Sequence, residues 1–292
     1  MLQIQNALGI LSSQVPTGNL LWVDQINGVD ALATRGRLTI PFKTLTAAKT
    51  AAKTGDTIMV LPGTYGDGNL LKDGVNWHFF PGANVLANET VFSTGGGGGV
   101  NCMVTGRGSF STSAGNVVHV AAGNVQITGG RMAGSGVDVV VLSGGTSVIE
   151  CDTIETSTGY PVNVSGGNHR LTAHRLSAST SEAICISGGE ARLTAYEIFA
   201  QTSPAVRHED TGASLSICHA RIVSDSDVAI YFTSGGGTSS RLKLLGCLLA
   251  GVGNCIGAAG SVSVELLGGC CATLNPHANV AKIGDLKVAA FT

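Results

Sequence analysis

A phrase of 22 residues recurs through the middle of the chain, and this repeat constrains the fold more than any other feature. The segment VSGGNHRLTAHRL from Val164 is followed by ISGGEARLTAYEI from Ile186, which matches it in residue type. Short apolar runs begin at 117, 139, 161, 183 and 205, each 22 residues after the last, and at 229 and 255 after intervals of 24 and 26. A fixed period of this size predicts a solenoid, in which each repeat packs only on its neighbours.

Each repeat contains three short strand-like runs rather than a strand and a helix. In one repeat they are 162–164, 170–172 and 175–177. Positions one repeat apart should stack at the inter-strand spacing of about 4.8 Å, so that apolar positions form inward rows. The rows expected are Val118, Val140, Val162, Ile184, Val206, Ile230; Val120, Leu142, Val164, Ile186, His208, Phe232; Ile127, Ile149, Leu171, Leu193, Ile217; and Met132, Ile154, Leu176, Ile198, Ile222. We therefore predict an all-β fold, a single-stranded right-handed parallel β-helix with three strands per coil and about nine or ten coils.

Composition supports this fold and excludes several others. Glycine accounts for 42 of the 292 residues, in GG and GGG groups between short Val, Ile and Leu runs, which favours short strands and tight turns. A net charge of −2 argues against a nucleic-acid partner. No run of about 18 apolar residues predicts a membrane span, and the start lacks the basic and apolar segments of a signal peptide.

Eight cysteines occur without CxxC spacing, at 102, 151, 185, 218, 247, 255, 270 and 271. We expect them to be buried small side chains rather than metal ligands, and we expect no metal or other cofactor. Neighbouring coils could also bring Cys247 and Cys270 together, so one disulfide stays open as an alternative.

The first quarter of the chain does not share the 22-residue register. Phe42, Leu45, Ala48, Ala51 and Ala52 have helical spacing, with Thr39 or Thr44 as the cap and Gly55 as the stop. Residues 57–61 should form a strand that ends at the Pro62–Gly63 turn. The organisation expected is a lead-in over 1–20 and one β-helix domain over 21–292. Within it, 21–86 hold the capping helix and first coils, 117–271 the regular coils and 272–292 an irregular C-terminal cap.

The segments PFKTLTAAKTAAKTGDTIMVLPGTY and NLLKDGVNWHFFPGANV resemble the opening of pectate-lyase-like right-handed β-helix proteins. With WVDQINGVDALATRGRLTIPF, the start is most similar to β-helix domains of bacteriophage tail and tailspike proteins. This resemblance covers residues 21–86, and the rest of the chain shares only the coil pattern. It implies a helix that plugs the open end of the coil, a homo-trimer, and a place in a virion tail or on a cell surface. Lyases, hydrolases, adhesins and structural fibres share this fold, so the resemblance implies architecture more than activity.

Two carboxyl groups in one turn column are the candidate catalytic pair. Glycosidases use two carboxyl groups roughly 5 Å apart for retention or 6.5–9.5 Å apart for inversion. Asp138 and Glu182 lie two coils apart, hence about 9–10 Å between backbones. Tyr160 lies between them, where a sugar ring could stack. The alternative is that all three are solvated turn residues.

Outward positions of the first strand give the candidate substrate-binding residues. The outward row reads His119, Val141, Asn163, Cys185, Arg207, Tyr231, and the densest polar segment is RHED at 207–210. The substrate-binding candidates are Asn163, Arg207 and Tyr231 from this row, Glu209 and Asp210 from that segment, and Tyr160 from the turn column. Within that segment His208 falls in an inward apolar row. A two-residue insertion could turn it outward, a hydrogen bond could satisfy it inside, or it could act on a ligand. A second row, Arg131, Thr153, Arg175, Glu197, Arg221, is expected to be a solvated charge ladder of little energetic weight.

The functional hypothesis from these features is recognition of an extended polysaccharide on a cell surface by a phage-tail-like or surface β-helix protein. One alternative is a polysaccharide hydrolase or lyase with Asp138 and Glu182 as its acids. The absence of clustered outward aspartates on the first strand weakens the lyase form, because Ca²⁺ takes 6–8 oxygen ligands. Another alternative is a structural or oligomerising stalk without a ligand.

Overall fold

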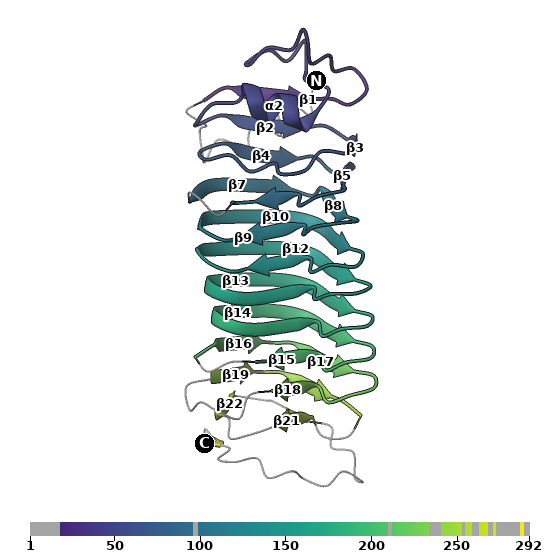
Figure 1. Ribbon diagram of the computed structural model, residues 1–292, viewed down its shortest axis with the longest axis vertical. Helices are drawn as coiled ribbons and strands as arrows, with labels where there is room; N and C mark the ends of the chain where they lie inside the picture. The colour runs from purple at the N-terminus through teal and green to yellow at the C-terminus, as the bar shows by residue number, and fades with distance from the viewer. Residues whose placement is uncertain are drawn as a thin grey trace.

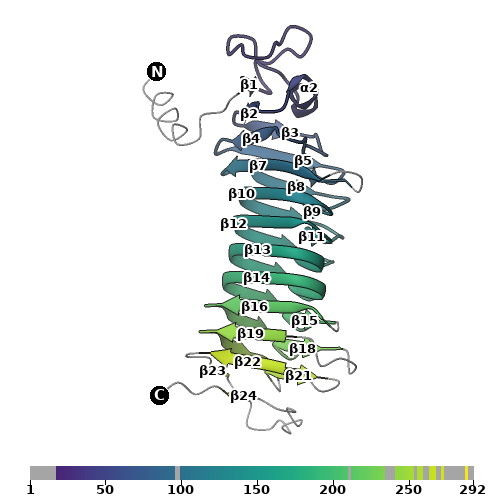
Figure 2. The ribbon, with the colours of Figure 1, turned by 90° about the vertical axis from the view of Figure 1, so that its left-hand side faces the viewer.

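The protein is a parallel β-solenoid of about nine turns, which confirms the predicted fold class. The computed structural model describes residues 18–95, 99–209, 212–233, 241–252, 255–258, 263–267, 271–272 and 287–288. Figures 1 and 2 show the coils stacked along one long axis, with α2 and β1 at the N-terminal end. Most of the predicted lead-in and of the predicted C-terminal cap lies outside the described residues.

Three rows of parallel strands form the sides of the solenoid. The first side consists of β6 (Phe92–Ser93), β9 (Val118–Val120), β11 (Val140–Leu142), the starts of β13 (Val162–Ala178) and β14 (Ile184–Ala200), β15 (Val206–His208), β18 (Ile230–Phe232) and β21 (Ile256–Ala258). The second side consists of β1 (Leu20–Val23), β2 (Thr57–Val60), β4 (Asn76–Phe79), β7 (Val100–Gly106), the starts of β10 (Gly123–Gly134) and β12 (Thr146–Thr156), the middles of β13 and β14, β16 (Ser214–Cys218), β19 (Arg241–Leu245), β22 (Ser263–Leu267) and β24 (Lys287–Val288). The third side consists of β3 (Gly63–Tyr65), β5 (Ala83–Ala87), β8 (Ser109–Thr112), the ends of β10, β12, β13 and β14, β17 (Arg221–Ser224), β20 (Leu248–Ala250) and β23 (Cys271–Ala272).

The predicted inward rows are present in register. Val140 pairs with both Val118 and Val162, and Val162 pairs with Ile184. All of these side chains are at most 2% exposed. Burial of one aliphatic side chain contributes about 1.5–3 kcal/mol, and the rows repeat that contribution at every coil.

The GG pairs turn the chain from the first side to the second. Their second members Gly145, Gly167 and Gly189 have φ of 68°, 82° and 74°, a left-handed conformation that side chains disfavour. A Cβ atom on Gly167 would lie 2.5 Å from the carbonyl oxygen of Gly145 in the preceding coil. The repeat therefore needs glycine here both for backbone conformation and for close coil stacking.

The helix α2 (Leu45–Ala51) lies at the N-terminal end of the stack, next to β1 and β2. Thr44 is its N-cap, and its side chain accepts a hydrogen bond from the amide of Ala47 at 3.2 Å. Leu45 and Ala48 are fully buried against the first coils. The predicted helix and one of its two candidate caps are thus confirmed.

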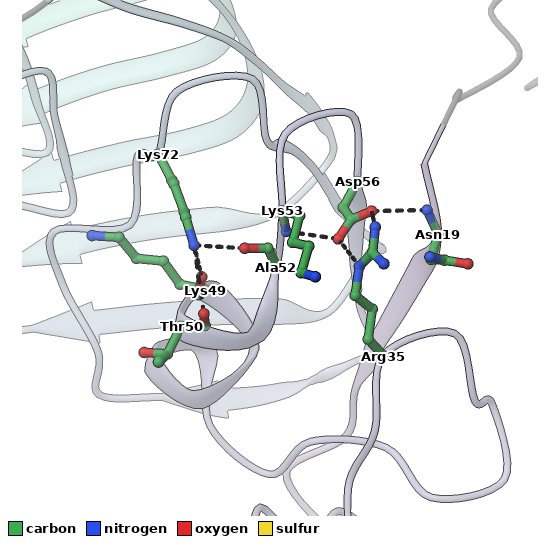
Figure 3. Close-up of polar contacts among 8 residues, drawn as sticks. All are labelled: Asn19, Arg35, Lys49, Thr50, Ala52, Lys53, Asp56 and Lys72. Atoms are coloured by element: carbon green, nitrogen blue, oxygen red, sulfur yellow. Dashed lines mark hydrogen bonds and ion pairs between the residues drawn. The ribbon is translucent and has the colours of Figure 1, made fainter.

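A polar network ties this end together (Figure 3). The carboxylate of Asp56 is fully buried and accepts from Arg35 at 2.5 Å, from the amide of Asn19 at 2.8 Å and from the amide of Lys53 at 2.8 Å. Lys72 donates to the carbonyl oxygen of Ala52 at 2.6 Å, which satisfies a carbonyl group at the C-terminus of α2. The network therefore fixes the helix and the loop of Arg35 on the first coils.

Candidate functional site

Six of the eight predicted catalytic and binding residues gather along the first side together with Asn116, in a group that we call the first-strand cluster. It comprises Asn116, Asp138, Tyr160, Asn163, Glu182, Arg207 and Glu209. Four successive turns before the first side supply Asn116, Asp138, Tyr160 and Glu182, because the turn residues of successive coils stack as the strands do. These residues are neighbours because they recur at the 22-residue period of the coils.

Within the first-strand cluster, the carboxylate of Asp138 already has protein partners. One oxygen accepts from the backbone amide of Tyr160 at 2.8 Å, and the other accepts from the side-chain amide of Asn163 at 2.7 Å. Asn116 donates to the carbonyl oxygen of Asp138 at 2.7 Å. These bonds connect three successive coils, so Asp138 has an evident role in holding the turns in register.

The rest of the first-strand cluster is joined by ion pairs. Arg207 lies 3.3 Å from the carboxylate of Glu182 and 2.7 Å from that of Glu209. The Glu182 side chain is only 12% exposed, so this pair is partly withdrawn from water. The Nε atom of Arg207 is buried and has no hydrogen-bond partner among the described residues.

Burial dominates the electrostatics of this cluster. It raises the pKa of the Cys185 thiol to about 12, and nearby carboxylates act in the same direction. Burial also raises the pKa of Tyr160, with smaller contributions from neighbouring acidic groups and an opposing one from Arg207. The thiol is therefore protonated at neutral pH and is a poor nucleophile.

The remaining predicted residues divide between the surface and the core. Tyr231 pairs with Arg207 in register, on the outward row of the first side. Asp210 lies outside the described residues. His208 points inward, is 2% exposed and stacks on Phe232 with ring centroids 5.2 Å apart, so the alternative that it turns outward is wrong.

A second candidate site lies at the corner between the second and third sides. This corner groove has a volume of about 540 Å³, and its charged and aromatic lining consists of Arg107, Glu150, Asp152, His174, Tyr196 and His219. Small inward residues such as Gly129 and Ala173 mark the bend at which the strands change direction. The groove crosses several coils and is therefore elongated along the solenoid axis.

Three of these residues occupy one corner position in successive coils. Asp152, His174 and Tyr196 are each separated by 22 residues, and the strands on both sides of them pair in register. The rings of His174 and Tyr196 stack with centroids 5.0 Å apart and planes 11° apart. Tyr196 is nevertheless 68% exposed, although most large aromatic side chains in the described part of the chain are buried. The same 22-residue period that gave the inward rows could have located this outward corner row in the sequence.

The backbone at the C-terminal end of the groove is unusual. His219 has φ of 56°, one of two non-glycine residues with positive φ among those described. Its amide donates to the carbonyl oxygen of Leu245 in the next coil at 2.8 Å. Such a conformation is uncommon for residues other than glycine. His219 adopts it at the corner of its coil, where it lines the end of the groove.

The acidic groups of the corner groove differ from the glutamates elsewhere on the second and third sides. The side chains of Glu150, Asp152 and Arg107 form no hydrogen bond or ion pair with any described residue. By contrast, Glu197 is paired with Arg175 at 3.2 Å and with Arg221 at 2.8 Å, which confirms the predicted charge ladder. Within the described residues, the groove is thus the part of the second and third sides where acidic side chains have neither a hydrogen-bond partner nor an ion-pair partner.

Another groove of about 540 Å³ lies at the start of the second-side strands and is rich in amides. Asn124 donates to Asn101 at 2.9 Å, and Asn101 donates through its backbone to Asp73 at 2.9 Å. Beneath it, Ser147 and His169 form a buried pair at 2.9 Å, with the other ring nitrogen of His169 on the carbonyl oxygen of Gly166 at 2.7 Å. These groups satisfy one another and therefore stabilise the turns.

No set of three or more His, Cys, Asp or Glu side chains in the described ranges is arranged to hold a metal ion. Cys247, one member of the disulfide pair that the sequence leaves open, is buried, and the other member, Cys270, lies outside the described residues. Within the described part of the chain, no helix has the length and apolar character needed to cross a bilayer. Comparison with family models, with curated proteins and with solved structures gives no match for this chain.

Proposed function

We propose that the protein is a surface or tail-type β-solenoid that recognises an extended cell-surface polysaccharide, which binds in the corner groove. The resemblance of residues 21–86 to phage tail and tailspike domains supports the class of protein. The open, elongated groove supports the class of ligand. Its lining residues run from the coil of Arg107 to the coil of His219, five coil steps or about 24 Å, which suits a chain of several sugar rings.

The observation that carries this proposal is the exposed, stacked ring of Tyr196. An aromatic side chain of this size is normally withdrawn from water, because burying it contributes to stability. Here the ring is held in place by His174 yet remains mostly exposed, inside a groove that also offers carboxylates and an arginine. A fixed aromatic surface beside polar groups suits a sugar, whose ring has apolar C–H faces and polar hydroxyl edges.

The test is a glycan array of bacterial surface polysaccharides with the full chain, followed by calorimetric titration of the strongest ligand. We expect binding that is lost in Tyr196→Ala and retained in Tyr231→Ala, the matched tyrosine on the first side. Complete silence on the array would contradict polysaccharide recognition and would leave the stalk alternative. Loss of binding in Tyr231→Ala alone would move the site to the first-strand cluster.

Hydrolysis or lyase cleavage is the second candidate function, with Asp138 and Glu182 as acids that both contribute to the electrostatic environment of Cys185. Incubating the protein with the same polysaccharides and measuring reducing ends and unsaturated products separates cleavage from recognition. Product that disappears in Asp138→Ala and in Glu182→Ala would favour the enzyme. Ligand binding without product would favour recognition alone. The trimer that the resemblance implies is testable by sedimentation of the full chain.

A further inference from the structure

We infer that the ligand of the corner groove carries a positively charged amine, as in a polysaccharide with free amino sugars. This inference rests on the proposed function and specifies its substrate class. It combines the shape of the groove, its aromatic pair and the charges that have no partner in the protein.

The negative charges of the groove come from Glu150 and Asp152, which lie two residues apart on one coil. Glu150 is in register with Thr172 and Thr194 on the second side, and Asp152 precedes His174 by one coil in the corner row. One coil step is about 4.8 Å, so both carboxylates can reach a substituent on a sugar that packs against the ring pair.

Comparison with the other glutamates of the second and third sides shows that, among these glutamates, the lack of a partner is specific to the groove. Each of the others that the structure describes there forms an ion pair with a basic residue: Glu155 with Arg131, Glu190 with Arg192, Glu197 with Arg175 and Arg221, and Glu265 with Lys243. Among the described residues, Glu150 differs from these four glutamates in having no basic partner, and Asp152 beside it has none either; both line the groove. A ligand cation would therefore take the place that an arginine or lysine takes elsewhere.

The aromatic pair favours an organic ammonium group over a metal ion. Cations are attracted to the faces of aromatic rings, and desolvation in a groove strengthens the attraction. The described residues supply no set of side chains suited to a metal ion, and a hard cation such as Ca²⁺ would need 6–8 oxygen ligands. An amine on a sugar instead requires only carboxylates, beside a ring surface for the C–H groups.

Arg107 sets the direction in which such a ligand lies. The coil between Arg107 and Asp152 has Gly129 and Gly130 at the corner, and no ion pair joins Arg107 to an acid within the described residues. Two coil steps, about 9–10 Å, separate their backbones. The amine should therefore bind at the Asp152 end, and a neutral or acidic part of the ligand should lie toward Arg107.

The experiment compares oligosaccharides that share one backbone and differ only in the amine. Chitosan tetramer, with protonated amines, and its fully N-acetylated counterpart are titrated against the full chain by calorimetry, and an array extends the comparison to other backbones in free-amine and N-acetylated forms. We expect the amine form to bind at least tenfold more tightly. Glu150→Gln and Asp152→Asn should each reduce that preference several-fold, and added salt should weaken it.

Glu155→Gln is the matched control, because it removes one carboxylate from the same surface outside the groove and should leave the preference unchanged. Equal or tighter binding of the N-acetylated forms, with binding still lost in Tyr196→Ala, would overturn the amine inference and leave glycan recognition standing. Silence of every backbone, in both forms, would overturn both proposals together.

Discussion

The first-strand cluster and the corner groove are both polar, and both are built from residues at recurring positions along the coils. They differ in whether their charged groups are paired with other groups of the protein. In the cluster, Asp138 accepts two hydrogen bonds and Arg207 is held by two carboxylates. In the groove, Glu150 and Asp152 have no partner within the described residues, and Tyr196 projects into solvent. Polar groups that satisfy one another hold coils together, whereas groups left unsatisfied beside a hollow are available to a ligand.

Residue type alone therefore does not separate structural from ligand-binding residues on a solenoid. Both regions contain acids and a tyrosine one or two coils apart. Only the pairing of each group, which depends on the neighbouring coil, distinguishes them. Substitution of paired groups should therefore lower stability, and substitution of unpaired groups should lower binding.

The largest effect is expected where pairing is most complete, at Asp56 in the N-terminal network. Replacing Asp56 by Ala would leave Arg35 and two backbone amides without their acceptor, next to the buried first coils. Because breaking a buried pair costs more than making one gains, we expect a loss of about 3 kcal/mol in the free energy of unfolding. Urea denaturation measures it, and an unchanged midpoint would contradict the structural role of interlocked polar groups.

Tyr196→Ala should produce the largest effect on binding and almost none on folding. Aromatic residues at the centre of a binding site typically contribute 2 kcal/mol or more, so we expect affinity for the array ligand to fall about 30-fold. The ring is mostly exposed, so its removal should change the unfolding free energy by less than about 0.5 kcal/mol. Calorimetric titration and urea denaturation on the same preparation give both numbers. A variant that unfolds more easily yet binds normally would reverse the assignment.

Asp138→Ala should show the opposite behaviour. It leaves the amide of Tyr160 and the side chain of Asn163 without their acceptor, which costs about 1–3 kcal/mol when such groups are buried. We expect the urea midpoint to fall and ligand affinity to stay the same. Asp225→Asn, at an exposed turn carboxylate, is the control for removal of one negative charge. Unchanged stability together with lost binding or cleavage would place the active site in the first-strand cluster.

The sequence predicts more of the fold than of the site, and particular residues show why. The inward rows follow from the period, because every coil must place an aliphatic residue such as Val140 or Val162 in the same slot. The helix follows from local spacing and a cap at Thr44. The inward position of His208 also follows from its row, although only the structure shows its stacking on Phe232.

The corner groove could not be selected from the sequence in the same way. Asp152, His174 and Tyr196 have the right period, but the period does not say whether an outward row lines a hollow or a flat side. Ion pairing has the same limit: Glu150 and Glu155 look alike in sequence, and only the neighbouring side chains show that one is unpaired and the other is bound to Arg131.

Stability should fall as the pH falls below about 6.5, because two histidines are held neutral in the folded protein. Burial lowers the pKa of His78 and of His169, whose ordinary value is 6.5. A folded-state pKa below the unfolded one means that the stabilisation is complete above pH 6.5 and is lost as the unfolded chain takes up protons below it. Urea midpoints from pH 8 to pH 5 measure this loss, and His169→Gln should make it shallower. A loss of the same slope in the variant would contradict the role of His169.

The smallest effect is expected at the exposed charge ladder. Arg131→Ala removes the partner of Glu155 on the third side, where both side chains are at least 36% exposed. Water screens such pairs, so we expect a loss of less than about 1 kcal/mol and no change in ligand affinity. A loss comparable to that of Asp56→Ala would show that exposure is a poor guide to the contribution of a pair.

The most direct test of the binding site is a crystal structure of the full chain with a bound oligosaccharide taken from the array. Sugar rings packed on Tyr196 between Arg107 and His219 are the predicted result. Density for the oligosaccharide on the first side, against Tyr160, Arg207 or Tyr231, with the corner groove holding only solvent, would contradict it.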